Sequence, residues 1–161
     1  MTNDTHVKKL RELLVTAVEG NESHIAFDAA VKDFPVKQYG TKPKGAPHSA
    51  WELLEHLRIA QRDILDFSRD PDNYKEKKWP DDYWSHSAAP ADEDAWQHSI
   101  DTFKADRLAL ERLINDPESD LWKAFSHGNG QTLLREAILV ANHNSYHLGQ
   151  LMFLKKMLEA Q

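Results

Sequence analysis

The stretch QTLLREAILVANHNSYHLGQLMFLKKMLE, residues 131–159, is the most informative part of the sequence. Its apolar residues recur every three or four positions, which is the period of an α-helix with one buried face. Two histidines, His143 and His147, fall inside this apolar stripe rather than on the polar side. The stripe consists of Leu133, Val140, Leu151, Leu154 and Leu158. The stretch therefore predicts a long amphipathic helix that carries two imidazoles on its inner face.

Three further long helices are predicted upstream of this one. The periodicity places them over residues 5–19, from Ser49 to Pro71 and from Asp92 to Pro117, with a shorter piece over 22–33. Ser49 and Glu52 fit a capping box, which marks the start of a helix. No strand-like alternation is visible. We therefore expect an all-α fold, an antiparallel four-helix bundle, with residues 1–161 forming a single metal-binding domain.

Composition excludes several classes of protein. The formal net charge is −6 and no run of basic residues offsets it, which argues against a nucleic-acid surface. The absence of cysteine excludes disulfides, thiolate catalysis and cysteine-type zinc sites. No apolar run approaches the length of a membrane span, and the first residues lack a signal-peptide pattern. We expect a cytoplasmic protein, and the nine histidines make a metal site worth seeking.

The spacing of His143 and His147 allows them to bind one cation. Side chains at i and i+4 lie one above the other on a helix. A zinc-protease motif would need glutamate directly after the first histidine, and Asn144 stands there. A catalytic zinc takes three protein ligands, so a third must come from a facing helix. His56, beside Leu57 at the edge of an apolar face, is the best candidate. The alternative is a pair of core histidines satisfied by hydrogen bonds, at the cost of two desolvations.

Two carboxylates are candidate catalytic residues. Glu52 lies one turn before His56 and could orient a metal-bound water, although the capping box is a competing role for it. Glu136 lies seven residues before His143, hence on the same face, and could support a ligand or stand at the rim of the site. The remaining histidines are expected to be mostly exposed. They are His6, His24, His48, His86, His98 and His127.

Two other features carry weaker expectations. Glycine inside a helix lowers the stability of that helix, so Gly149 is expected to be there for a local reason. We expect that it permits close packing of the helix. The loop aromatics Trp79, Tyr83 and Trp84 are expected to cap one end of the bundle, with a pocket rim or a dimer contact as the alternative.

Three segments together carry a family resemblance. They are HSAWELLEHLRIAQRDIL at 48–65, KWPDDYW at 78–84 and GNGQTLLREAILVANHNSYHLGQL at 128–151. This combination resembles the DinB/YfiT-like family of four-helix-bundle proteins with metal sites, and the resemblance covers most of the chain. It implies a metal held by one histidine of the second long helix and an H-x-x-x-H pair of the last. These positions correspond to His56, His143 and His147.

The resemblance implies fold and site more firmly than activity. Related proteins include metal-dependent thiol transferases that use glutathione, bacillithiol or mycothiol, and a maleylpyruvate isomerase with a thiol cofactor. We therefore expect an enzyme that uses zinc or nickel to activate a low-molecular-weight thiol or water against a small-molecule substrate. Thiol transfer is the leading version and hydrolysis the second. The competing class is a non-catalytic, metal-stabilised binding or stress-response protein, and we expect a homodimer in either case.

Overall fold

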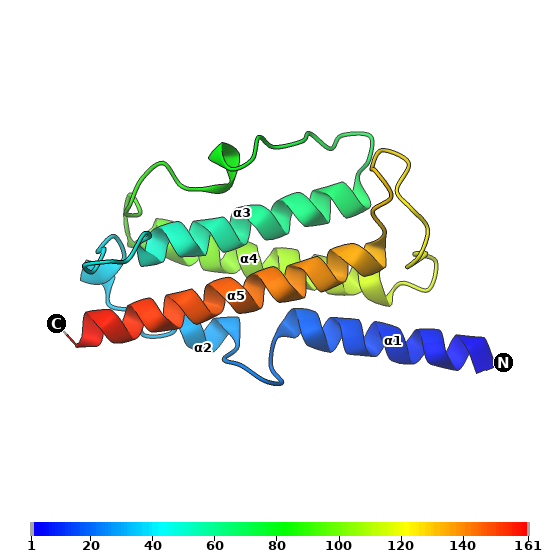
Figure 1. Cartoon of the computed structure of the whole chain (residues 1–161), viewed down its shortest axis with the longest axis horizontal. Coiled ribbons are helices and arrows are strands. Elements are labelled where there is room, and N and C mark those ends of the chain that lie inside the picture. The colour runs from blue at the N-terminus through cyan, green and yellow to red at the C-terminus, as the bar shows by residue number, and fades with distance from the viewer. Residues whose placement is uncertain (1, 161) are drawn as a thin grey trace.

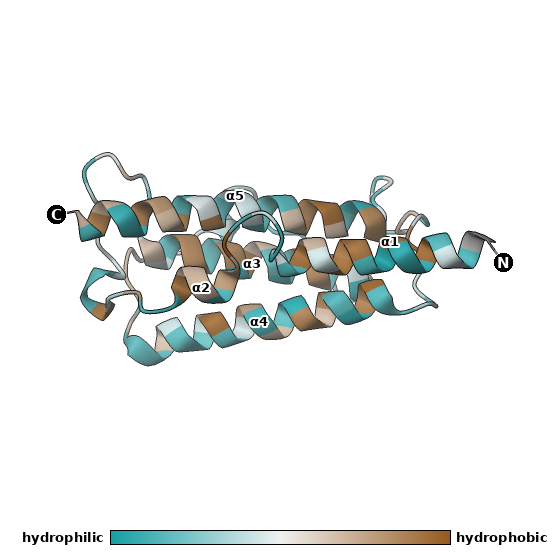
Figure 2. Ribbon diagram, turned by 90° about the horizontal axis from the view of Figure 1, so that it is seen from below, coloured by the Kyte–Doolittle hydropathy of each residue, from teal (hydrophilic) through white to brown (hydrophobic). Residues whose placement is uncertain are grey.

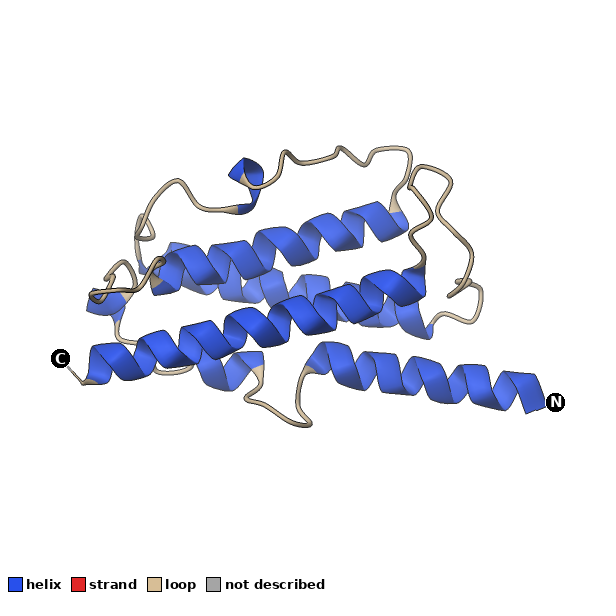
Figure 3. Cartoon of the chain, viewed as in Figure 1, coloured by secondary structure: helices blue, strands red, loops and turns tan. Residues whose placement is uncertain are grey.

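The computed structural model describes residues 2–160 and contains four long helices and one short one (Figure 1). They are α1 (Thr2–Glu19), α2 (Phe27–Val31), α3 (Ala50–Arg69), α4 (Glu93–Asn115) and α5 (Leu133–Glu159), with 3-10 turns η1 (Val36–Gln38) and η2 (Asp81–Tyr83). Over the described residues the only β-type pairing is an isolated bridge between Ala124 and Thr132, and no strand is present (Figure 3). The predicted all-helical bundle is confirmed.

The four long helices form a ring in which α3 and α1 each pack against both α4 and α5. The helix directions are mixed, because α3 and α4 run the same way while α1 and α5 run the opposite way (Figure 1). The antiparallel neighbours are thus α3 with α5 and α1 with α4. Residues 70–92 make this order possible, since they cross back along the outside of the bundle between the end of α3 and the start of α4. The longest loop therefore lies beside α3.

Side-chain caps define the starts of α3, α4 and α5. Ser49 accepts a hydrogen bond from the Glu52 amide, and the Glu52 carboxylate accepts from the Ser49 amide at 2.7 Å, so the predicted capping box is present. The side chains of Asp92 and Thr132 cap α4 and α5 by accepting from the amides of Ala95 and Arg135, without the reciprocal bond of a capping box. The piece expected over 22–33 is helical only in α2. It ends early because Asp33 takes a positive φ of 53° shortly before Pro35.

The core consists of two apolar clusters with a polar layer between them. One cluster includes Trp51, Phe103 and Leu151, and the other includes Leu65 and Val140. On α3 and α5, the residues between these clusters are those at 58–63 and 141–147, and His56 lies at the edge of this layer. Hydrophobic and hydrophilic residues alternate along each helix as an amphipathic bundle requires (Figure 2). The histidines predicted to bind a metal belong to the polar middle of the bundle.

Buried hydrogen bonds tie this polar layer together. The Gln61 amide donates to the Phe103 carbonyl at 2.7 Å, and Asn144 donates to Gln61 Oε1 at 3.0 Å. These two bonds connect α5, α3 and α4 at mid-bundle. Because buried polar groups cost free energy unless they are paired, the network specifies how the helices align around the histidines.

The expectation for Gly149 is wrong. A Cβ built on Gly149 would meet no atom within 4 Å, so the glycine does not serve close helix packing within this chain. It lines an open apolar groove of about 470 Å³ on the outer side of α5, together with Tyr146 and Phe153. No helix within residues 2–160 is both long enough and apolar enough to span a membrane.

Candidate metal centre

The structure brings together the three histidines that the sequence singled out. His56 comes from α3, whereas His143 and His147 come from consecutive turns of α5. The Nε2 atom of His56 lies 3.0 Å from Nε2 of His143 and 3.1 Å from Nε2 of His147. Ligand atoms of all three lie within 4.8 Å of one another, an arrangement that could hold a metal ion. His56 is only 1% exposed and His147 is also buried.

Hydrogen bonds at the outer ring nitrogens orient two of the imidazoles. His56 Nδ1 lies 2.8 Å from the Tyr83 carbonyl oxygen, and His147 Nδ1 lies 2.7 Å from Gln150 Oε1. Both partners are carbonyl oxygens, which only accept, so each Nδ1 carries the proton and each Nε2 presents a lone pair. Two lone pairs facing each other at 3.1 Å repel unless a cation lies between them. Histidine ligands of metals are held in this way by an outer hydrogen bond.

The protonation of the cluster suits metal binding. Burial, and to a lesser extent the charges of the neighbouring histidines, lower the pKa of His143 and His147 to about 4. Burial also lowers the pKa of His56. A buried imidazolium beside two others would be destabilised by both effects. The three rings are therefore neutral near pH 7, which is the form that binds zinc or nickel.

The aromatic loop covers one side of the cluster. The Trp84 indole lies between the rings of His48 and His56, with 3.9 Å between ring centroids on each side and nearly parallel planes. Tyr83 contributes its carbonyl to His56 and donates its hydroxyl to Asp63 at 2.6 Å. The loop thus lies along the bundle beside the cluster, and the expectation that it caps one end is wrong. Spacing along the sequence did not reveal that Trp84 stacks on His56 and on His48.

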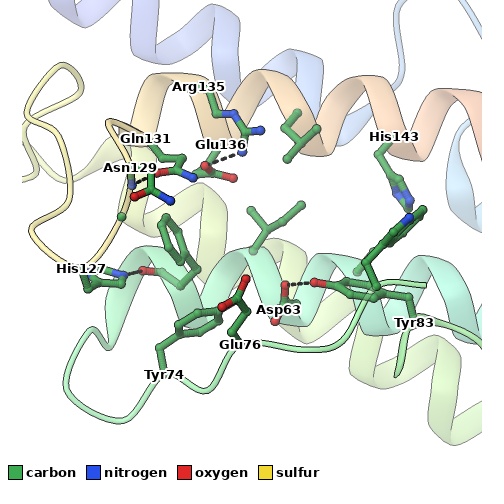
Figure 4. A pocket seen from close by; sticks show the side chains of 16 residues that line it. Asp63, Tyr74, Glu76, Tyr83, His127, Asn129, Gln131, Arg135, Glu136 and His143 are labelled. Carbon is green, nitrogen blue, oxygen red and sulfur yellow. Dashed lines mark hydrogen bonds and ion pairs between the residues drawn. The ribbon is translucent and has the colours of Figure 1, made fainter. Parts of the chain in front are cut away.

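A cavity of about 430 Å³ lies next to the cluster, in the groove between α3 and α5 (Figure 4). His143 is the one member of the cluster that lines it. Loop residues Tyr74, Trp79 and Tyr83 form an aromatic wall, and the turn at residues 127–131 closes the far end. A molecule in this cavity would approach the candidate metal centre from the side on which His143 lies.

The two candidate carboxylates lie in different surroundings. Glu52 accepts hydrogen bonds from the Ser49 amide and from Lys42 Nζ, and it does not line the cavity. Glu136 does line the cavity, where it is buried and bound to Arg135 at 2.7 Å (Figure 4). The structure thus places Glu52 in the helix cap and Glu136 in the cavity, two helical turns from His143.

Most of the remaining histidines lie at the surface, as expected. His48 differs from the rest, because it is partly buried against Trp84. The exposed ones are His6, His24, His86, His98 and His127.

An all-helical bundle with three inward-facing histidines defines the class of this protein. The family model of the DinB superfamily matches residues 22–151, so the chain belongs to that superfamily. Comparisons with curated proteins and with solved structures produced no match. The resemblance seen in the sequence motifs is confirmed at the level of the family, and the activity must be argued from the site itself.

Proposed function

We propose that this protein is a divalent-metal-dependent enzyme whose metal is held by His56, His143 and His147. The observation that carries the proposal is the convergence of three neutral Nε2 atoms, two of them oriented by carbonyl oxygens. Three imidazoles fit zinc or nickel, which both favour nitrogen ligands of this kind. Over the described residues the cluster contains three such groups, so a bound ion would keep a position for a further ligand.

The residues of the chain have distinct tasks in this proposal. When bound, the metal supplies a Lewis acid that lowers the pKa of a water or thiol and so creates a nucleophile at neutral pH. Tyr83 and Gln150 hold His56 and His147 in the tautomer that binds a cation. Trp84 covers the face of His56 and limits access of water from that side. His143 lines the cavity, which is where we place the substrate.

The charge of the cavity favours water over a glutathione-like thiol as the nucleophile. Its lining contains the carboxylates Asp63, Glu76 and Glu136 but only one guanidinium, that of Arg135, which is already paired with Glu136. A thiol cofactor that carries several carboxylates would be repelled here. We therefore place hydrolysis ahead of the thiol transfer that the family resemblance implies. A purely structural metal site is disfavoured, because the histidine cluster adjoins an open cavity.

The metal triad is tested by replacing each histidine in turn. His56→Ala, His143→Ala and His147→Ala should each lose most of the bound metal, because two imidazoles make a weak site. The matched control is His98→Ala, since His98 is exposed on α4. Elemental analysis of protein purified without a histidine tag measures the metal, and circular dichroism checks that the helices remain. If all four variants keep one metal per chain, the proposal is wrong.

We also propose that residues 1–161 form one domain and that the protein is a homodimer. The support for the dimer is the outer side of α5, where Tyr146 and Phe153 are 66% and 67% exposed along the apolar groove beside Gly149. Exposed aromatic residues that border a groove are typical of surfaces that bind another protein. A second copy of this chain is the partner that we propose.

A further inference from the structure

The cavity beside His143 has an acidic end two helical turns away from the histidines. On α3, Asp63 lies seven residues after His56, and on α5, Glu136 lies seven residues before His143. Because α3 and α5 are antiparallel, both displacements point the same way along the bundle. Seven residues rise about 10 Å along a helix. The two carboxylates therefore lie on opposite walls of the groove, displaced along it away from His143 (Figure 4).

These carboxylates are buried, and within residues 2–160 the only direct ion pair that either of them forms with a cation joins Glu136 to Arg135. Asp63 is 8% and Glu136 is 2% exposed, and both line the cavity. Asp63 accepts from the hydroxyls of Tyr83 and Tyr74, and the charge of Lys77 is more distant. Glu136 is paired with the half-exposed Arg135. Burial raises the pKa of both groups, and the charge of Asp63 raises that of Glu136 further. A buried carboxylate is stabilised by a cation that is desolvated with it.

The wall of the cavity also suits a cation with an apolar stem. Phe67, Tyr74, Trp79 and Tyr83 line it, and Trp79 remains well exposed although it is a large apolar residue. Aromatic faces attract ammonium and guanidinium groups and pack against methylene chains. Glu76 adds a third carboxylate on the loop side. The lining thus combines negative charge with aromatic surface over a length of two helical turns.

We infer that the cavity binds a small organic cation, with its primary amine or guanidinium between Asp63 and Glu136 and its reactive group beside His143. This inference rests on the proposed function, because the metal site determines which end of the substrate lies beside His143. It assigns to Glu136 the binding of the substrate rather than proton transfer. The substrate class is therefore amines and guanidines with a spacer of roughly two helical turns, about 10 Å.

The test uses zinc-loaded protein and two hydroxamates that differ at one end. The hydroxamate group of hexanohydroxamate is a ligand for zinc, and 6-aminohexanohydroxamate adds an amine at the far end of the same chain. Calorimetry should show the amine probe binding about tenfold tighter or more, because a charge-assisted hydrogen bond is added. In the double variant Asp63→Asn, Glu136→Gln the advantage should disappear while hexanohydroxamate binds as before. Glu118→Gln, at an exposed loop position, is the matched control.

The outcomes separate this inference from the proposed function. If both probes bind wild-type protein equally, the cation site is wrong while the metal centre stands. If neither hydroxamate binds zinc-loaded protein, the open metal position is wrong, and the cation site is then tested alone with 1,6-diaminohexane on metal-free protein. Binding of the diamine that the double variant loses supports the cation site, and absence of binding overturns it.

Discussion

At the scale of single residues, the ring nitrogens of the histidine cluster need partners from outside the cluster. His56 is almost fully buried, so both of its ring nitrogens need partners. The Tyr83 carbonyl satisfies Nδ1, whereas Nε2 faces two other imidazoles. With Nδ1 protonated in both rings, hydrogen bonds alone leave the Nε2 lone pairs of His56 and His147 facing each other at 3.1 Å. A shared cation explains this contact.

The lowered pKa values predict how the metal-free protein responds to acid. His143 and His147 have a pKa of about 4 in the folded state, below the value of about 6.5 in an unfolded chain. Between these values the unfolded state binds more protons, so the histidine contribution to stability is present above pH 6.5 and is lost as the pH falls toward 4. We expect the urea midpoint of chelator-treated protein to fall over this window more steeply for wild type than for His147→Gln.

The comparison with a variant is needed because other groups titrate in the opposite sense. Burial raises the pKa of Glu136 and Asp106, and such carboxyl groups favour the folded state as the pH falls. The difference between wild type and His147→Gln isolates the contribution of His147 to the pH dependence of stability. His98→Gln should follow wild type at every pH, since His98 is exposed. Parallel curves for wild type and His147→Gln would contradict the burial argument.

At the scale of helices and loops, the capping box sets where α3 begins and thereby where His56 lies. Ser49 is fully buried, accepts from the Glu52 amide and donates to the Ala88 carbonyl, which anchors the end of the long crossing loop to the helix start. That loop carries Trp84 onto His56. The start of α3 and the cover of the candidate metal centre are therefore connected through one serine.

This connection predicts different effects of two substitutions in the cap. Ser49→Ala should lower the free energy of unfolding by about 1 to 2 kcal/mol, because the Glu52 amide and the Ala88 carbonyl lose their partner. Glu52→Gln should cost much less, since glutamine also serves in a capping box. Urea denaturation measures both. Glu52→Gln should also keep its metal, and loss of metal in that variant would show that Glu52 acts on the site and not only in the cap.

At the scale of the whole molecule, the proposed dimer gives a prediction about assembly. Phe153→Glu should convert the protein to a monomer, because it places a charge on the exposed apolar side of α5. The control is Leu108→Glu, which changes an exposed leucine on α4. Light scattering at micromolar concentration should report a dimer for wild type and for Leu108→Glu. A wild-type monomer would refute the proposal.

The helices and the candidate ligands could be predicted because their signals are local. A helical period needs only residues three and four apart, and the pair His143 and His147 is itself one such spacing. Ser49 and Glu52 are equally close in sequence. His56 could be named from its position at the edge of an apolar face and from the family resemblance. Local spacing thus determined the helices, the cap of α3 and two of the three histidines.

Only the tertiary structure decided what surrounds these histidines. The mixed helix directions follow from residues 70–92 crossing back along the bundle, and the same crossing puts Trp84 against His56. Asp63 and Glu136 lie on opposite walls of one groove because α3 and α5 are antiparallel. The buried hydrogen bonds at mid-bundle specify how these two helices align. Such contacts join residues far apart in the chain. Their energy comes from burial and pairing in the folded state, and no short-range pattern records it.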